Sequence, residues 1–176
     1  MRKDEFLRAA ALTPALADRW YDAVERALME FDIARPQRAA AFIAQVGHES
    51  GGFVYTRELW GPTAAQQRYE GRSDLGNVVP GDGFRYRGRG LLQITGRLNY
   101  AALAAALDVD VLARPELLEN EVLAARSAAW WWQSHDCNRY ADADDFEDLT
   151  RRINGGVNGL QDRYARWAVA KTALGA

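Results

Sequence analysis

The sequence of 176 residues predicts a mainly α-helical fold with a small β element in its middle. Apolar residues recur every three or four positions through the first third of the chain and again from Leu98 onward, as in helices that bury one face. From Phe53 to Thr95 this period breaks, and glycines and prolines divide the chain into turns and short strands. A glycine-rich stretch of this length is usually functional.

The first third predicts two long helices. Thr13-Pro14 combines a capping residue with a first-turn proline and predicts the start of the first helix. Its inward stripe consists of Leu16, Trp20, Val24, Ala27, Leu28 and Phe31. Pro36 opens the second helix, and Gly51-Gly52 ends it. We therefore expect Glu49 at or near the C-terminal end of a buried helix.

Helices resume after the glycine-rich stretch. The apolar pattern predicts one helix over Leu98–Leu107 and another that runs from behind Pro115 to Trp132. Two more helices flank an Asn-Gly-Gly-Val-Asn-Gly loop at residues 154–159. No internal repeat and no low-complexity linker divides the chain, so we expect a single catalytic domain over residues 1–176.

Composition excludes several classes of function. The 22 basic and 24 acidic side chains give a formal charge of -2, which provides no general attraction to nucleic acid or to anionic membranes. The longest apolar run, Ala101–Leu107, is far shorter than the ~20 residues of a membrane-spanning helix. Cys137 is the single cysteine, so an intramolecular disulfide is impossible. The N-terminal residues lack the apolar core of a signal peptide, and we expect synthesis and retention in a cytoplasm.

Glu49 is the first candidate catalytic residue. The negative end of the helix dipole, together with burial, disfavours an ionised carboxylate, so we expect a raised pKa at Glu49. A carboxyl group that stays protonated near neutral pH can act as the general acid in glycoside cleavage. The alternative is a structural glutamate that accepts hydrogen bonds from the backbone amides of the following turn.

Glycoside cleavage needs a second carboxylate, and two glutamates are candidates. Glu58 follows Glu49 by nine positions, and Glu70 lies further along the chain. The alternative for each is a surface salt bridge, of Glu58 with Arg57 or of Glu70 with a neighbouring arginine.

The segment 86–100 carries neutral hydrogen-bonding groups among glycines. Gln93, Thr95 and Asn99 are of the kind that binds sugar hydroxyls and acetamides, and glycines allow a ligand to approach the backbone. Arg85, Arg87 and Arg89 alternate just before them, so in a strand they would share one face. That face could meet an anionic polymer or form a solvated basic rim.

Metal chemistry finds no support in the sequence. His135 and Cys137 are near neighbours but lack the spacing of a zinc site. We therefore expect no metal site and no cofactor.

Three separated motifs carry a family resemblance. They are His48-Glu49-Ser50-Gly51-Gly52-Phe53, then Tyr86-Arg87-Gly88-Arg89-Gly90 with Gln93-Ile94-Thr95-Gly96-Arg97 and Asn99-Tyr100, and finally Asn154-Gly155-Gly156-Val157-Asn158-Gly159. In this order they resemble glycoside hydrolase family 19, and within it the bacteriophage endolysin branch more than the plant chitinases. Three motifs in register are a specific signal, whereas one alone would not be.

The resemblance implies a lysozyme-like fold of two lobes with a cleft between them, and hydrolysis of β-1,4 bonds between N-acetylated aminosugars, usually with inversion. Glu49 corresponds to the family's proton donor, and Thr95 to the hydroxyl that helps to hold the attacking water. The remaining residues expected to bind substrate or to support the acids are Gln93, Asn99, Tyr86, Asn154 and Arg163.

The resemblance leaves two positions for the second carboxylate. In the endolysin-like branch a glutamate about nine residues after the acid holds this position, which is Glu58 here. The chitinase branch places its base further on, in a segment similar to Tyr69–Arg72, which makes Glu70 the alternative. We favour Glu58, and in an inverting reaction the two carboxyl groups should lie roughly 6.5 to 9.5 Å apart.

We expect a monomeric endolysin that acts on peptidoglycan glycan strands, with no nucleic-acid partner and no stable insertion into a membrane. By analogy with the family, it would stay in the host cytoplasm until a companion holin releases it to the periplasm and cell wall. Three alternatives remain, namely a chitinase, a lytic transglycosylase that needs one acid only, and a non-catalytic glycan-binding module.

Overall fold

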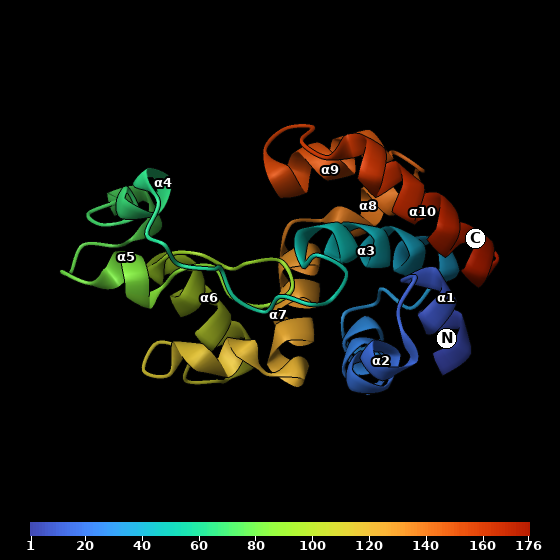
Figure 1. Ribbon diagram of the computed structural model, residues 1–176, viewed down its shortest axis with the longest axis horizontal. Coiled ribbons are helices and arrows are strands. Elements are labelled where there is room, and N and C mark those ends of the chain that lie inside the picture. Colours follow the sequence, from blue (N-terminus) through green and yellow to red (C-terminus); the bar gives the residue numbers. More distant parts are fainter. The chain divides into compact units, whose positions relative to one another are not determined.

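The computed structural model describes residues 1–176, which divide into two compact units. The first unit joins Met1–Val54 with Ala129–Ala176, and the second comprises Tyr55–Ala128. Regular structure is almost wholly helical, as predicted (Figure 1). The expected β element is reduced to two isolated antiparallel bridges, of Arg89 with Arg57 and with Ile94. Regular strands do not extend from these bridges because Gly90 and Gln93, both with positive φ, turn the chain sharply.

The first unit is built around one buried helix. Its elements are α1 (Lys3–Ala9), α2 (Pro14–Glu30), α3 (Pro36–Glu49), α8 (Cys137–Asp142), α9 (Phe146–Asn154) and α10 (Leu160–Leu174). Every residue of α3 from Arg38 to Gly47 is buried. Figure 1 shows α10 lying along α3, and α1 packs against α10. The chain passes from one unit to the other twice, between Val54 and Tyr55 and again within α7 (Glu121–Ser134).

The two long N-terminal helices confirm the predictions made from their start and stop signals. The Thr13 side chain accepts a hydrogen bond from the backbone amide of Leu16 at 3.3 Å, and Pro14 is the first residue of α2. Helix α3 ends at Glu49, and Gly51 and Gly52 then adopt positive φ. Glu49 therefore occupies the helix end at which the prediction placed it.

The second unit contains shorter elements. They are α4 (Ala64–Gln67), the 3-10 helix η1 (Ser73–Leu75), α5 (Asp82–Arg85), α6 (Arg97–Leu107), the 3-10 helix η2 (Pro115–Glu119) and the first part of α7. The single helix expected behind Pro115 is thus two elements. Asn120 separates them, because its side chain accepts a hydrogen bond from the amide of Leu123 at 2.9 Å and so caps a new helix.

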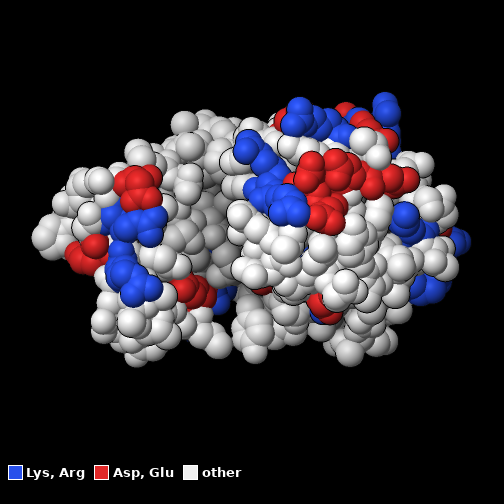
Figure 2. Space-filling model, turned by 90° about the horizontal axis from the view of Figure 1, so that it is seen from above, with Lys and Arg blue, Asp and Glu red and all other residues white.

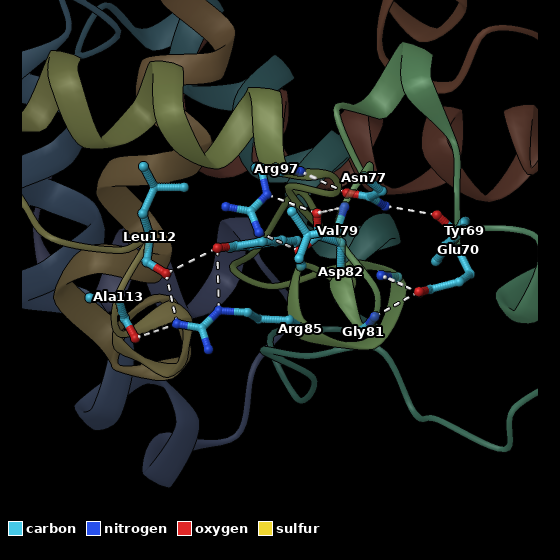
Figure 3. Close-up of polar contacts among 12 residues, drawn as sticks. Tyr69, Glu70, Asn77, Val79, Gly81, Asp82, Arg85, Arg97, Leu112 and Ala113 are labelled. Carbon is cyan, nitrogen blue, oxygen red and sulfur yellow. Dashed lines mark hydrogen bonds and ion pairs between the residues drawn. The ribbon is translucent and has the colours of Figure 1, made fainter.

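Buried charge holds the second unit together at Asp82. This side chain is 2% exposed and pairs with Arg97 through both carboxylate oxygens, with 2.8 Å between Arg97 Nε and Asp82 Oδ2. The amide of Val79 also donates to Asp82 Oδ2 at 3.0 Å (Figure 3). The hydrogen bonds from Arg97 hold the pKa of Asp82 below its ordinary value, although burial acts in the opposite direction.

The substitution Asp82→Asn should lower the free energy of unfolding near neutral pH by about 2 kcal/mol, because a charge-assisted bond is lost inside the unit. A carboxyl whose pKa falls on folding stabilises the folded state above its unfolded pKa of about 3.9, and this contribution disappears as pH falls through the folded pKa. The difference between wild type and variant should therefore shrink in acid. Urea unfolding at several pH values measures it.

The control for this prediction is Asp74→Asn, which alters an exposed ion pair with Arg72 in the same unit. Exposed pairs contribute little, so this variant should unfold like the wild type. A pH-independent loss of stability in Asp82→Asn would contradict the account.

Candidate functional site

Glu49 ends α3 in the first unit and pairs there with Arg163. The Arg163 side chain is 1% exposed and that of Glu49 is 21% exposed, so an almost fully buried cation holds a carboxylate that reaches solvent. Arg163 comes from the first turn of α10. The helix end disfavours negative charge on Glu49, whereas the guanidinium favours it.

The same guanidinium gathers the motifs of the first unit. Arg163 also donates to the Gln45 side chain and, at 3.1 Å, to the backbone oxygen of Asn158. Gln45 in turn donates to the Thr150 hydroxyl at 2.8 Å. Two helices and the 154–159 loop thus meet α10 at one buried cation. By contrast, the side chain of Asn154, at the end of α9, is exposed.

His48, next to Glu49, is fixed from α10. Its Nδ1 lies 2.7 Å from Asp162 Oδ2, and Arg166 donates to the same oxygen at 2.7 Å. Hydrogen bonds from Arg166 and then from His48 lower the pKa of Asp162. Gly159 lies against the imidazole with φ of +71°, and a Cβ atom there would overlap the ring. Glycine is therefore required at position 159 by close packing against His48.

Glu58, in the second unit, makes two hydrogen bonds with Gly88. The Glu58 amide donates to the Gly88 oxygen at 2.8 Å, and the Gly88 amide donates to Glu58 Oε2 at 3.2 Å. The other carboxylate oxygen accepts from Gln66 Nε2 at 3.0 Å and from the Tyr69 hydroxyl at 3.5 Å. Burial raises the pKa of Tyr69, and the nearby charge of Glu58 raises it further.

Gln66 is a supporting residue that the sequence analysis missed. It is buried, and its side-chain oxygen accepts from the amides of Gly61 and Thr63, at 3.1 and 2.8 Å. The Thr63 side chain accepts from the Gln66 amide in return, which completes a capping box at the start of α4. The Thr-x-x-Gln spacing was the available signal for this local structure.

Gln93 and Thr95 lie against Gly88. A Cβ atom at Gly88 would lie 2.8 Å from Gln93 Oε1 and 3.3 Å from Thr95 Oγ1. The Thr95 hydroxyl donates to the Gln93 backbone oxygen at 2.9 Å, and the exposed Asn99 side chain donates to the Thr95 oxygen at 2.7 Å. The second unit therefore brings the Glu58 carboxylate, the Thr95 hydroxyl and the Gln93 side-chain amide to one glycine, Gly88.

Two other predicted residues serve the structure of this unit. Tyr86 is only 2% exposed, and its hydroxyl donates to the Leu112 backbone oxygen at 3.2 Å. Each oxygen of the Glu70 carboxylate accepts a backbone amide hydrogen bond, from Gly81 at 2.6 Å and from Gly83 at 2.9 Å (Figure 3). Glu70 thus anchors the start of α5.

The distribution of surface charge and the placement of potential metal ligands complete the description of the side chains. On the face drawn in Figure 2, acidic and basic side chains lie beside one another in each unit. No three His, Cys, Asp or Glu side chains form a group that could hold a metal ion. His135 instead stacks on Trp131 with ring centroids 3.8 Å apart, and burial raises the pKa of Cys137 to about 12.

None of the helices combines the length and the apolar character needed to span a bilayer.

Relatives of known sequence match most of the chain. Residues 27–145 match the glycoside hydrolase family 19 model described as chitinase class I. A glycosyl hydrolase family 19 domain-containing protein of Haemophilus influenzae is 35% identical over 172 residues, covering 81% of this chain and 83% of that protein. An endochitinase of Arabidopsis thaliana is 36% identical over 118 residues, covering 66% of this chain. The aligned part is 39% of the plant protein, so the chain spans less than half of its length.

Solved structures share the fold. Chitinase C from Streptomyces griseus HUT6037 superposes with a TM-score of 0.79 at 25% identity, covering 99% of this chain and 76% of that one. A bacterial family 19 chitinase gives a TM-score of 0.77 at 25% identity, covering 99% and 95%. These matches confirm the predicted lysozyme-like fold. The chain belongs to glycoside hydrolase family 19 and is a glycosidase.

Proposed function

We propose that this glycosidase is an endolysin that cleaves β-1,4 bonds between the N-acetylated aminosugars of peptidoglycan and thereby lyses a host cell. The observation that carries the catalytic part of the proposal is that Glu58, Gln93 and Thr95 all lie against Gly88. A carboxylate, a hydroxyl and an amide in one place are suited to activating water next to a sugar.

Glu49 acts as the general acid in this proposal. It gives its proton to the leaving glycosidic oxygen and becomes a carboxylate, whose negative charge the buried Arg163 guanidinium stabilises. Glu58 acts as the general base. Its donors, the Gly88 amide and the Gln66 side chain, fix the orientation of the carboxylate. The Thr95 hydroxyl donates its hydrogen bond to the Gln93 backbone oxygen, so its lone pairs are available to accept a hydrogen bond from a water molecule.

The contacts of Glu70 support Glu58 as the base. Both Glu70 oxygens already accept backbone amides at the start of α5, and a Cβ atom at Gly83 would lie 2.8 Å from Glu70 Oε2. A carboxylate packed in this way is a structural anchor, and taking it into catalysis would leave two amides without acceptors.

The wider setting follows the resemblance to the phage endolysin branch. We infer a monomer that acts on glycan strands, without nucleic acid and without stable insertion into a membrane. It would remain in the host cytoplasm until a holin releases it to the periplasm and the cell wall. Chitin is the second candidate substrate, and it is favoured because the similar Arabidopsis and Streptomyces proteins are chitinases.

Turbidity loss of outer-membrane-permeabilised Gram-negative cells tests the proposal. Glu49→Gln and Glu58→Gln should each lower the rate of lysis at least about 100-fold, because each removes a proton-transfer group. Glu70→Gln is the matched control and should retain most of the activity. Activity in Glu58→Gln together with its loss in a folded Glu70→Gln would contradict the assignment. A folded wild type that degrades chitin without lysing cells would favour the second substrate.

The pKa of Tyr69 provides a test of the site geometry that needs no substrate. Because the negative charge of Glu58 contributes to raising the pKa of Tyr69, Glu58→Gln should lower that pKa. Glu70 does not contribute to this shift, so Glu70→Gln should leave the pKa unchanged. Titration of ¹³C-labelled tyrosine by NMR measures both variants. An equal change in the two variants would show that Glu58 is not the neighbour of the phenol.

A further inference from the structure

The second unit contains a pocket of about 820 Å³ that the proposed catalytic chemistry does not use. Its walls come from residues 79–82, 84–87, 89 and 97 and from residues 110, 112, 113, 115 and 116. Figure 3 shows the polar contacts that fix Arg85, Arg97 and the Leu112–Ala113 backbone around it. Glu58, Gln93, Thr95 and Asn99 are not among the lining residues. Its volume is in the range of small-molecule sites, about 300 to 1,000 Å³.

Two ion pairs at the wall are complete within the protein. Asp82 is neutralised by Arg97. Arg89 is neutralised by Glu119, with 2.8 Å between Arg89 Nε and Glu119 Oε1. The remaining charged residues of the wall form no ion pair, and they are Arg85, Arg87, Asp110 and Glu116. The pocket therefore presents two cations and two anions that have no ion-pair partner in the chain.

Both unbalanced cations are held in place by neutral groups. Arg85 donates to the backbone oxygens of Leu112 and Ala113, at 3.0 and 2.8 Å. Arg87 lies over the exposed Phe84 ring, with its Cζ 4.1 Å from the ring centroid, and donates to the Phe84 backbone oxygen at 2.9 Å. Its Nε is buried without a hydrogen-bond partner, a rare state for a buried donor. An anionic ligand group would supply the charge that both guanidiniums lack.

Both unbalanced anions lie on the 110–116 segment. Asp110 accepts the amide of Ala113 at 3.1 Å, next to the carbonyl that holds Arg85. Glu116 is exposed at the start of η2. These carboxylates repel a purely anionic ligand and attract an ammonium group. A neutral glycan would use neither set of charges, so the pocket is complementary to a ligand that carries both a carboxylate and an ammonium group.

We propose that this pocket binds the stem peptide of peptidoglycan, with peptide carboxylates toward Arg85 and Arg87 and a free amine toward Asp110 and Glu116. Stem peptides carry carboxylates along their length, and those with a diamino acid also offer an ammonium beside a carboxylate. This assignment rests on the proposed function, because chitin has no such peptide. It gives the second unit a means to distinguish peptidoglycan from chitin.

Titration of the ¹⁵N-labelled full chain with a free stem tetrapeptide that contains a diamino acid tests the proposal. Saturable shifts should appear in the backbone amides of residues 79–87 and 110–116 other than Pro80 and Pro115. Arg85→Gln and Arg87→Gln should each weaken binding at least about tenfold, since each removes one charge-assisted contact. Arg72→Gln is the matched control, because Arg72 belongs to the same unit but pairs with Asp74 outside the pocket. It should bind the peptide as the wild type does.

A second probe tests the anions without changing the protein. The same tetrapeptide with its amines acetylated should bind the wild type more weakly, because Asp110 and Glu116 would lose their partner. No saturable shift at millimolar peptide, or equal binding of the acetylated peptide, would overturn the proposal. Lysis without peptide binding would contradict the proposed role of this pocket and leave the proposed function unaffected. Peptide binding without glycan cleavage would support the role of the pocket and contradict the proposed function.

Discussion

Burial of the Arg163 guanidinium is the constraint on which the first unit depends. Removing a cation from water costs several kcal/mol unless its donors are satisfied. The chain satisfies them with the Glu49 carboxylate, the Gln45 amide and the Asn158 backbone oxygen. Because these groups belong to α3 and to the 154–159 loop, one charge fixes the relation of two separated motifs within the unit. The position of Glu49 is therefore a consequence of how the unit accommodates Arg163.

The two proposed catalytic carboxylates differ in their donors. Glu49 pairs with the Arg163 guanidinium, which carries a full positive charge. Glu58 instead accepts hydrogen bonds from neutral donors, namely the Gly88 backbone amide, the Gln66 side chain and, at long range, the Tyr69 hydroxyl. A group that loses its proton during the reaction benefits from a cation, which stabilises the charge that develops. A group that gains a proton is better served by neutral donors, since these oppose protonation less strongly than a cation does. In the proposed mechanism, the cation therefore stabilises Glu49 after proton transfer, and the neutral donors hold the Glu58 carboxylate in place.

The long helices were predictable from the sequence, because each combines a terminal signal with several turns of apolar periodicity. Thr13-Pro14 and Pro36 mark where α2 and α3 begin, and Gly51-Gly52 marks the end of α3, which placed Glu49 at the helix terminus. The short helices α1, α4, α5 and α8 were not predicted, because one or two turns are too few to show a period. Hydrogen-bond partners were beyond sequence reasoning for a different reason. The contacts that distinguish Glu58 from Glu70 come from residues well apart in the chain, such as Gly88 and Gly81.

Product chemistry tests the central claim, that two carboxylates hydrolyse the glycan, most directly. Purified peptidoglycan would be digested with the wild type, and the released fragments followed by mass spectrometry and by NMR of the anomeric protons. The account predicts reducing sugar ends that first appear with inverted configuration, together with loss of the products when Glu58 is replaced by Gln. Fragments that end in anhydro-muramic acid, formed without any need for Glu58, would contradict it and identify a lytic transglycosylase that uses one acid.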